Sequence, residues 1–160
     1  MSFSPTGKTL AGVAIDEDHS VAVYNVESGT LLGTEKGDKA WIIDICLKDD
    51  TVFATSGVKH FKEWNIGATL TGKKGQFGKF DMRHGVCRYM GNQCLSASIT
   101  GELYVWNGTT IGKAVKLHDK PIDCIHISGE QYVLTGGKDN KVNVLAFNTL
   151  ALLHSFTINE

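Results

Sequence analysis

The chain has 160 residues, of which 42% are hydrophobic and 21% charged, and its formal net charge is −1 at pH 7. These values exclude a disordered chain and a uniformly basic surface for nucleic acid. No apolar run approaches the roughly 20 residues that span a bilayer, and no basic-then-apolar leader follows Met1, so we expect an intracellular protein without membrane or nucleic-acid partners.

Short β-forming runs separated by turns follow one another along the chain. Eighteen glycines and only two prolines suit tight turns, and no segment of useful length has the helical period. After a strand end and turn at residues 3–8, the predicted strands lie at 9–15, 20–26, 30–34, 40–47, 51–56, 57–64, 86–90, 94–98, 102–106, 109–117, 122–127, 131–135, 141–147 and 150–158. We expect residues 69–85, rich in glycine and basic side chains, to form a long irregular loop.

One local pattern occurs four times: a polar or glycine turn, then a β-rich run with a large apolar residue at the same point. These anchor residues are spaced by 40, 42 and 39 positions, and they are Tyr24, Trp64, Trp106 and Leu145. Self-similarity at this period is typical of propeller blades. The repeat therefore predicts an all-β, partial β-propeller of about four blades, each of four antiparallel strands, at residues 1–38, 39–85, 86–120 and 121–160.

Alternation within the third strand of each unit sets the register. Valine or leucine stands one and three residues before the anchor in the first, third and fourth units, so these side chains should face one neighbouring blade and the anchor the other. Glu63 breaks the pattern in the second unit. Because a buried unpaired carboxylate is costly, we expect Glu63 to lie near the rim or beside a lysine.

The cysteines show no spacing that is typical of a metal site or a redox motif. Cys46, Cys87, Cys94 and Cys124 include no C-x-x-C pair, and no histidine stands at ligand spacing from a cysteine pair. We therefore expect small buried thiols, with no metal and no cofactor.

Charge is unevenly distributed. Residues 59–88 contain seven basic and two acidic side chains, whereas the remainder of the chain is net acidic. One interpretation is an ordinary solvated loop; the other is a docking surface for an acidic partner, because local charge speeds and orients encounter. The candidate partner-binding residues are Lys59, Lys62, Lys73, Lys74, Lys79 and Arg83.

The anchors, with a serine or threonine eight to ten residues earlier and a histidine in the preceding connection, resemble WD repeats. In such repeats a histidine, a Ser/Thr, an aspartate and the tryptophan form a buried hydrogen-bonded set. The third unit offers His84, Ser96, Ser98 and Trp106, with Thr100 where the aspartate would stand. The fourth offers His118, Thr135 and Asp139, with Leu145 in place of the tryptophan.

A finer resemblance covers nearly the whole chain. The segments ATSGVKHFKEW and KKGQFGKF, the first unit IDEDHSVAVYNVESGTLLGT, and the later LSASITGELYVWNG and LTGGKDNKVNVL resemble the echinoderm microtubule-associated-protein-like family. The resemblance implies about four blades of the first propeller of a longer, cytoplasmic and cytoskeleton-associated protein. It also implies that tubulin or microtubules are the partner, with the acidic tubulin tails facing the basic segment.

No catalytic arrangement is apparent, and we do not expect an enzyme. The chain has no G-x-S-x-G elbow and no P-loop, and Asp44 and Asp123 occupy matching places in their units, which indicates a repeated structural role. Two functions remain open: a microtubule-binding scaffold, and a WD-type scaffold of another intracellular complex.

Ring closure is the other open question. Four blades of a larger ring would expose two apolar blade faces, which closed propellers cover. An open arc, a closed four-blade ring and a ring completed by two chains are all compatible with the sequence. We expect the isolated chain to self-associate through these faces.

Overall fold

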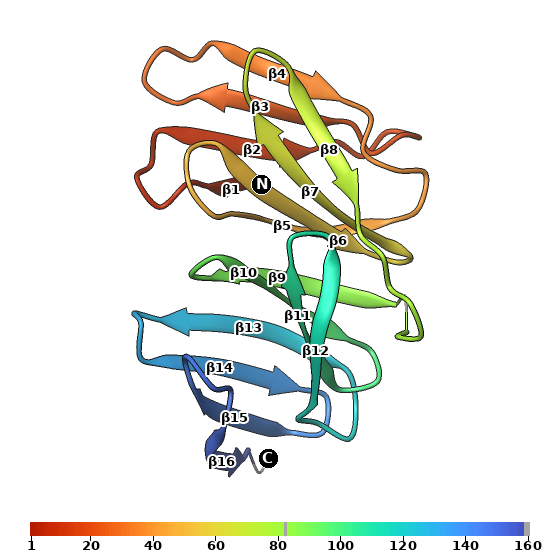
Figure 1. Ribbon diagram of the computed structural model, residues 1–160, viewed down its shortest axis with the longest axis vertical. Coiled ribbons are helices and arrows are strands. Elements are labelled where there is room, and N and C mark those ends of the chain that lie inside the picture. The colour runs from red at the N-terminus through yellow and green to blue at the C-terminus, as the bar shows by residue number, and fades with distance from the viewer. Residues whose placement is uncertain (82, 159–160) are drawn as a thin grey trace.

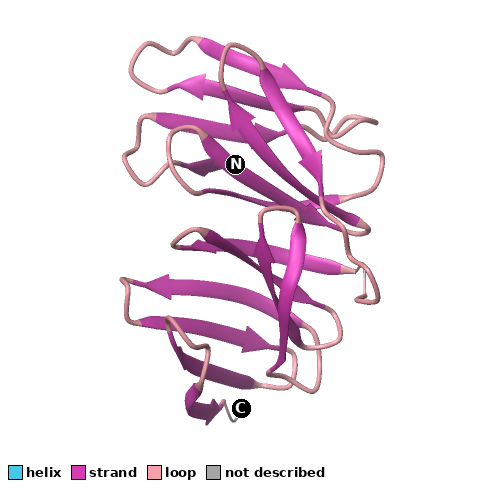
Figure 2. Cartoon of the chain, in the orientation of Figure 1, coloured by secondary structure: helices cyan, strands magenta, loops and turns pink. Residues whose placement is uncertain are grey.

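Every regular element in the described part of the chain is a β-strand (Figures 1 and 2). The computed structural model describes residues 1–81 and 83–158, and of His84 only its place in a strand. Sixteen strands form four separate antiparallel sheets of four strands each, and within this range no helix is long and apolar enough to cross a bilayer. The predicted all-β propeller of four-stranded blades is confirmed.

The blades follow the chain in order. Blade 1 contains β1 (Ser2–Phe3), β2 (Thr9–Val13), β3 (Val21–Asn25) and β4 (Leu31–Glu35). Blade 2 contains β5 (Ile42–Leu47), β6 (Val52–Gly57), β7 (His60–Ile66) and β8 (Leu70–Lys74). Blade 3 contains β9 (His84–Met90), β10 (Gln93–Ser98), β11 (Glu102–Asn107) and β12 (Thr110–Lys116). Blade 4 contains β13 (Ile122–Ser128), β14 (Tyr132–Gly137), β15 (Lys141–Ala146) and β16 (Leu152–Thr157).

Each blade is a simple meander in which consecutive strands pair. The first strands of successive blades pack against one another, β1 on β5, β5 on β9 and β9 on β13, so they form the inner edge of the assembly. The fourth strands form the outer edge. Blade 3 therefore begins at His84, and residues 84–85 belong to its first strand, whereas the sequence prediction put them in the preceding unit.

Three apolar cores lie between neighbouring blades. The first joins Val21 and Val23 of β3 to Trp64 of β7. The second stacks Phe61 of β7 on Trp106 of β11, with ring centroids 3.8 Å apart. The third packs side chains of β11 against blade 4. Because side chains alternate along a strand, the third strands of blades 2 and 3 each contribute to the cores on both sides of their blade.

The sequence prediction was wrong about the start of the segment 69–85. Its first residues form β8, an ordinary outer strand that pairs with β7 from Lys62↔Lys74 to Ile66↔Leu70. Apart from Leu70 the strand is exposed, so it has no apolar alternation by which a sequence could reveal it. In the described part of the segment, the irregular loop is limited to residues 75–81 and 83.

The four blades form an open arc. Blade 1 lies at one end of the molecule and blade 4 at the other, in the order in which the chain passes through them (Figure 1). Tyr24, the blade 1 anchor, faces away from blade 2 and is 39% exposed, whereas Trp64, Trp106 and Leu145 are fully buried against a preceding blade. The two end faces of the arc are open.

Candidate partner-binding surface

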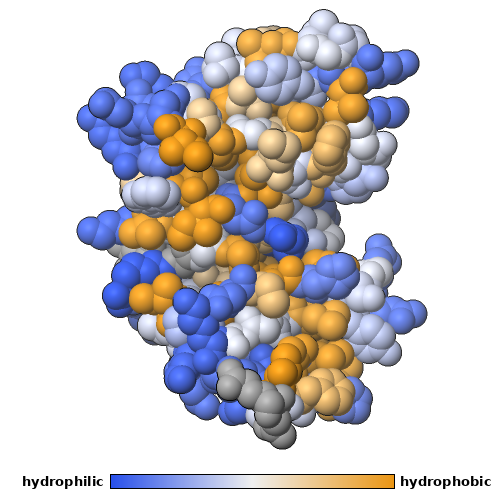
Figure 3. Space-filling model, turned by 180° about the vertical axis from the view of Figure 1, so that it is seen from behind, coloured by the Kyte–Doolittle hydropathy of each residue, from blue (hydrophilic) through white to orange (hydrophobic). Residues whose placement is uncertain are grey.

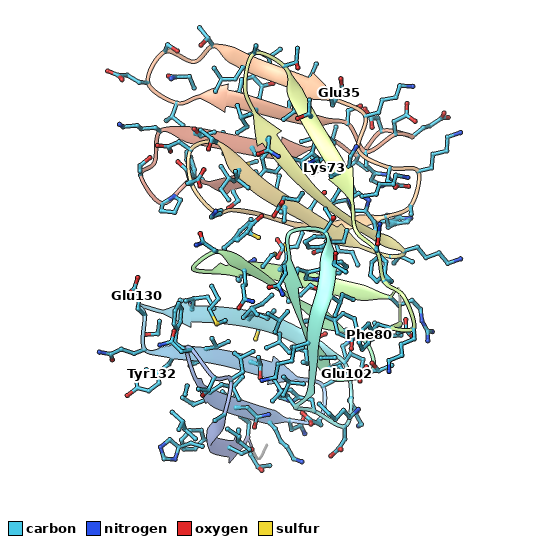
Figure 4. The ribbon with its side chains drawn as sticks, viewed as in Figure 1. Glu35, Lys73, Phe80, Glu102, Glu130 and Tyr132 are labelled. Atoms are coloured by element: carbon cyan, nitrogen blue, oxygen red, sulfur yellow. The ribbon has the colours of Figure 1, made fainter. Side chains whose placement is uncertain are left out.

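The basic segment lies on the outer edge of blade 2 and on the loop that leads into blade 3. Lys62 is on β7, Lys73 and Lys74 are on β8, and Lys59 is in the β6–β7 turn. Figure 4 shows Lys73 on β8 and Glu35 on the neighbouring β4. The basic side chains of blade 2 thus come from two neighbouring strands and a turn.

Three of the six candidate cations are neutralised or covered within the chain. Lys74 Nζ lies 3.2 Å from Asp38, and Arg83 Nη2 lies 2.9 Å from Asp81. Lys62 Nζ is 3.8 Å from the centroid of the Trp64 ring, a cation–π contact, and burial together with Lys74 lowers the pKa of Lys62. These side chains are engaged before any partner arrives.

The other three candidates are exposed. Lys59, Lys73 and Lys79 form no ion pair with any residue that the structure describes. A partner that meets them need not displace a carboxylate of the chain first. These three lysines, which we call the free lysine strip, are the part of the basic segment best able to bind an acidic surface.

The loop that carries Lys79 is fixed to the body of the protein. Gly75 packs so closely on Phe61 and Trp106 that an added Cβ would lie 2.8 Å from both rings, which explains a glycine there. Phe77 is buried edge-on against Trp106, and the backbone N–H of Gln76 donates to Thr109 O at 2.7 Å. Much of the glycine-rich motif is thus structural, and it presents Lys79 from a fixed backbone.

Blade 2 contains a buried polar network that the sequence prediction missed. Trp64 Nε1 donates to Thr55 Oγ1 at 2.9 Å, and the same hydroxyl lies 2.7 Å from His60 Nε2. His60 Nδ1 in turn lies 3.3 Å from Asp38 Oδ2. Relative to the WD pattern the histidine and aspartate have exchanged places, because Asp38 is in the connection before the blade and His60 begins β7. The spacing of Thr55 before Trp64 was the available signal.

The buried position of this network shifts the pKa values of His60 and Asp38. Burial lowers the pKa of His60, an effect that exceeds the opposing attraction of Asp38. Burial raises the pKa of Asp38, but hydrogen bonds from the Ala40 N–H, His60 and Lys74 lower it by a larger amount. The resulting pKa is about 2. The pair is therefore a neutral imidazole beside a carboxylate at neutral pH.

Blade 4 builds the corresponding network in the expected order. His118 Nδ1 lies 2.9 Å from Asp139 Oδ1, and His118 Nε2 lies 2.9 Å from Thr135 Oγ1. Leu145 has no donor to offer, and Asn143 Nδ2 instead donates to Leu117 O at 2.8 Å. The connection before blade 4 is therefore tied to two strands of that blade.

Blade 3 distributes its polar groups differently. Trp106 Nε1 donates to Ser96 Oγ at 2.8 Å, whereas Ser98 Oγ lies 2.8 Å from Thr100 Oγ1. The backbone of His84 pairs with Ser98, and the His84 side chain lies outside the described part of the chain. Ser96 is thus the residue that binds the tryptophan.

Glu63 has a partner that the sequence did not indicate. It is half-buried and accepts a hydrogen bond from Tyr89 Oη at 3.2 Å, across the interface between blades 2 and 3. Lys73 lies opposite Glu63 in the β7–β8 register, but the two form no ion pair. A tyrosine on β9, far away in sequence, satisfies the carboxylate.

Apolar hollows lie beside the inner strands. One, of about 230 Å³, is lined by residues that include Ile15, Trp41 and Ile43, and Trp41 is 67% exposed. Another, of about 230 Å³, shares Ile43 and extends to Val58 and Ile99. Figure 3 shows apolar side chains in several places on the back of the molecule, from the upper to the lower blades.

The buried histidines and the accessible surface features of the described residues lie in different places. The buried histidines are held by hydroxyls and carboxylates of their own blades and do not point into a hollow with other acid–base groups. The accessible features are the free lysine strip and the apolar hollows. Exposed apolar side chains such as Trp41 are typical of surfaces that bind another protein, whereas exposed lysines can attract and orient an acidic partner.

Comparison with known proteins agrees with this fold. No protein-family model matches the chain. The chain is 30% identical over 149 residues to the ciliary WD repeat-containing protein ctxp80 of Euplotoides octocarinatus, covering 89% of the chain and 21% of that protein. It is 27% identical over 165 residues to the cilia- and flagella-associated protein 44 of Mus musculus, covering 94% of the chain and 9% of that protein.

Among solved structures, the β-propeller domain of Cps50 (Swd1) from Myceliophteria thermophila superposes with a TM-score of 0.81 at 13% identity. The match covers 98% of the chain and 58% of that domain. The chain thus spans only a small part of the length of the two ciliary relatives. Neither relative is named for the echinoderm microtubule-associated-protein-like family. Membership of that family therefore stays a prediction. In fold the chain is a WD-repeat-type β-propeller of four blades, and in sequence it is similar to two ciliary or flagellar proteins, one of them named as a WD-repeat protein.

Proposed function

We propose that the chain is a non-enzymatic scaffold segment of a microtubule-associated protein, and that it binds tubulin through the free lysine strip. The single observation that carries the proposal is that Lys59, Lys73 and Lys79 are exposed and unpaired in the most basic part of the chain. The microtubule surface is a suitable counterpart because tubulin carries acidic tails. Electrostatic complementarity of this kind raises the rate of association and fixes orientation.

The relatives provide a consistent setting. One is named as a ciliary protein and the other as cilia- and flagella-associated, and cilia and flagella are built on microtubules. We therefore place the chain in the cytoskeleton, in the cytoplasm or in a cilium.

Microtubule co-sedimentation tests the proposal. The variant Lys59→Gln/Lys73→Gln/Lys79→Gln should lose most of its binding, and wild-type binding should fall as salt screens the contact. The matched control is Lys8→Gln/Lys113→Gln/Lys120→Gln, which removes the same charge from exposed lysines outside the basic segment. If both triple variants bind alike, the free lysine strip is not the contact; if wild type binds equally well after proteolytic removal of the tubulin tails, the tails are not the counterpart.

A second candidate function is a scaffold for another intracellular complex without microtubule affinity. The exposed Trp41 beside an apolar hollow favours it, because aromatic side chains at such places often anchor a protein partner. Trp41→Ala separates the two candidates. The Trp41→Ala variant is compared with wild type in two assays: co-sedimentation with microtubules and capture of a partner from ciliary extract. If the variant still sediments with microtubules but loses the captured partner, the hollow beside Trp41 binds that other partner and not the microtubule.

A further inference from the structure

Three cysteines that are distant in sequence meet in the core between blades 2 and 3. Cys46 comes from β5, Cys87 from β9 and Cys94 from β10, and their sulfur atoms all lie within 4.8 Å of one another. Cys46 Sγ and Cys87 Sγ are 3.3 Å apart, and none of the three side chains is more than 4% exposed. No short-range spacing motif could reveal this cluster.

The separation of the sulfur atoms suits a metal ion with three thiolate ligands. Three sulfurs at about 2.3 Å from an ion, the length of a zinc–thiolate bond, lie roughly 4 Å from one another. A small opening of the Cys46–Cys87 contact would bring these two sulfurs to that spacing, and all three already lie within 4.8 Å of one another.

The ligand set favours a soft, three-coordinate ion. Among the described residues, the group able to supply ligand atoms here consists of the three cysteines, without a histidine or carboxylate. Structural zinc sites almost always have four ligands, whereas thiolates alone select soft ions such as copper(I). The surrounding core includes Phe61, Tyr104 and Trp106, so the site is dry.

The groups around the cluster bear on its charge. Arg88 Nη1 donates to Cys87 O and pairs with Asp44 at 2.6 Å, so a guanidinium lies close to the sulfur atoms. Burial raises the pKa of the Cys46 and Cys94 thiols. Burial also raises the pKa of Cys87, but hydrogen bonds with Cys46 and Cys94 lower it by more, to about 5. Each cysteine binds the ion as a thiolate, so every protonated thiol of the cluster releases its proton to solvent and binding strengthens as pH rises.

We propose that Cys46, Cys87 and Cys94 form a copper(I) site that links blades 2 and 3. The competing outcome is a Cys46–Cys87 disulfide. The geometry favours the ion because three sulfur atoms meet within 4.8 Å of one another, and a disulfide would leave the third without a role. The proposal is independent of the microtubule contact, whose exposed lysines lie in the β6–β7 turn, on β8 and in the following loop.

Copper(I) titration of two variants with equal cysteine counts tests the site. The full chain is refolded without oxygen in the presence of copper(I) and the coloured competitor bicinchoninate. Cys124→Ser keeps the cluster and removes the exposed cysteine, whereas Cys94→Ala breaks the cluster and keeps Cys124. Cys124→Ser should bind one copper(I) per chain, and Cys94→Ala should bind at least about 100-fold more weakly, which is the upper end of what loss of an outer-shell partner costs.

X-ray absorption on Cys124→Ser alone gives a readout that does not depend on the folding of Cys94→Ala. Three sulfur neighbours near the distance given above would support the site. Nitrogen or oxygen neighbours, equal affinity of the two variants, or a chain that takes up no copper would each overturn it. So would recovery of Cys124→Ser with a mass two hydrogens lower, which signals the disulfide.

Discussion

His60 and Asp38 show how one buried contact makes stability depend on pH. The lowered pKa of His60 means that the unfolded chain binds a proton at this residue more readily than the folded chain does. Its contribution is complete above the unfolded pKa of about 6.5 and declines as pH falls below that value. Asp38 and Asp139, each with a folded pKa of about 2, contribute stability that is complete above their unfolded value of 3.8 and declines toward pH 2.

We therefore predict that the melting temperature falls in two stages on acidification, first below about pH 6.5 and again below about pH 4. His60→Gln, measured by thermal unfolding across this range, should weaken the first stage and leave the second. His126→Gln is the matched control, because His126 is exposed on blade 4. A first stage that survives in His60→Gln would assign it to another group.

At the scale of the strand, the sequence predicts the strands that have an alternating apolar pattern. It misses the strands and residues whose structure depends on contacts with other parts of the chain. The third strands are evident because valine or leucine alternates before the anchor in three of the four units, as Val21 and Val23 do before Tyr24. Strand β8 is missed because Leu70 is its one buried side chain: the strand pairs with β7 through its backbone, and its other residues, including Lys73 and Lys74, are exposed. The roles of Asp38 and His60 are also missed. The WD pattern has the histidine in the connection before the blade and the aspartate in the later turn, and blade 2 has them the other way round.

Contacts between blades are the least predictable from sequence, because each joins strands about forty residues apart. The sulfur cluster and the bond from Tyr89 to Glu63 are examples. Asp44 is another: its carboxylate accepts the Cys87 N–H at 3.0 Å and pairs with Arg88. The matching residue of blade 4, Asp123, has no following blade, and its side chain is 56% exposed.

This pair gives a prediction with a built-in control. Asp44→Ala should lower the free energy of unfolding by about 1–3 kcal/mol, because it leaves the Cys87 N–H and the Arg88 guanidinium without their acceptor. Asp123→Ala should change it by no more than about 0.5 kcal/mol. Chemical denaturation of both variants checks this. Equal losses would show that the aspartate acts within its own strand rather than between blades.

The molecule as a whole is an arc whose two end faces are apolar. On blade 1, the register places Phe3, Leu10, Tyr24 and Leu31 side by side across the four strands, on the face opposite blade 2. On blade 4, Val142 lies opposite Phe156, which is 55% exposed. Elsewhere in the arc, the equivalent blade faces are buried against a neighbouring blade. Both end faces are therefore as apolar as a blade–blade interface but are exposed.

We predict that the isolated chain self-associates head to tail, the blade 1 face of one copy packing on the blade 4 face of the next. Sedimentation velocity at increasing concentration should show growing species. Tyr24→Lys and Phe156→Lys each place a charge on one face, and each variant alone should be a monomer. Thr71→Lys, on the exposed outer strand of blade 2, is the control and should associate as wild type does.

Mixing the two monomeric variants distinguishes this geometry from like-to-like pairing. Tyr24→Lys keeps an intact blade 4 face and Phe156→Lys keeps an intact blade 1 face, so one copy of each can form a single good contact. The mixture should therefore yield dimers and nothing larger, because every remaining face carries a lysine whose burial without a partner is costly. Pairing between identical faces would instead let each variant dimerise alone, and a wild-type chain that stays monomeric at all concentrations would refute the interface altogether.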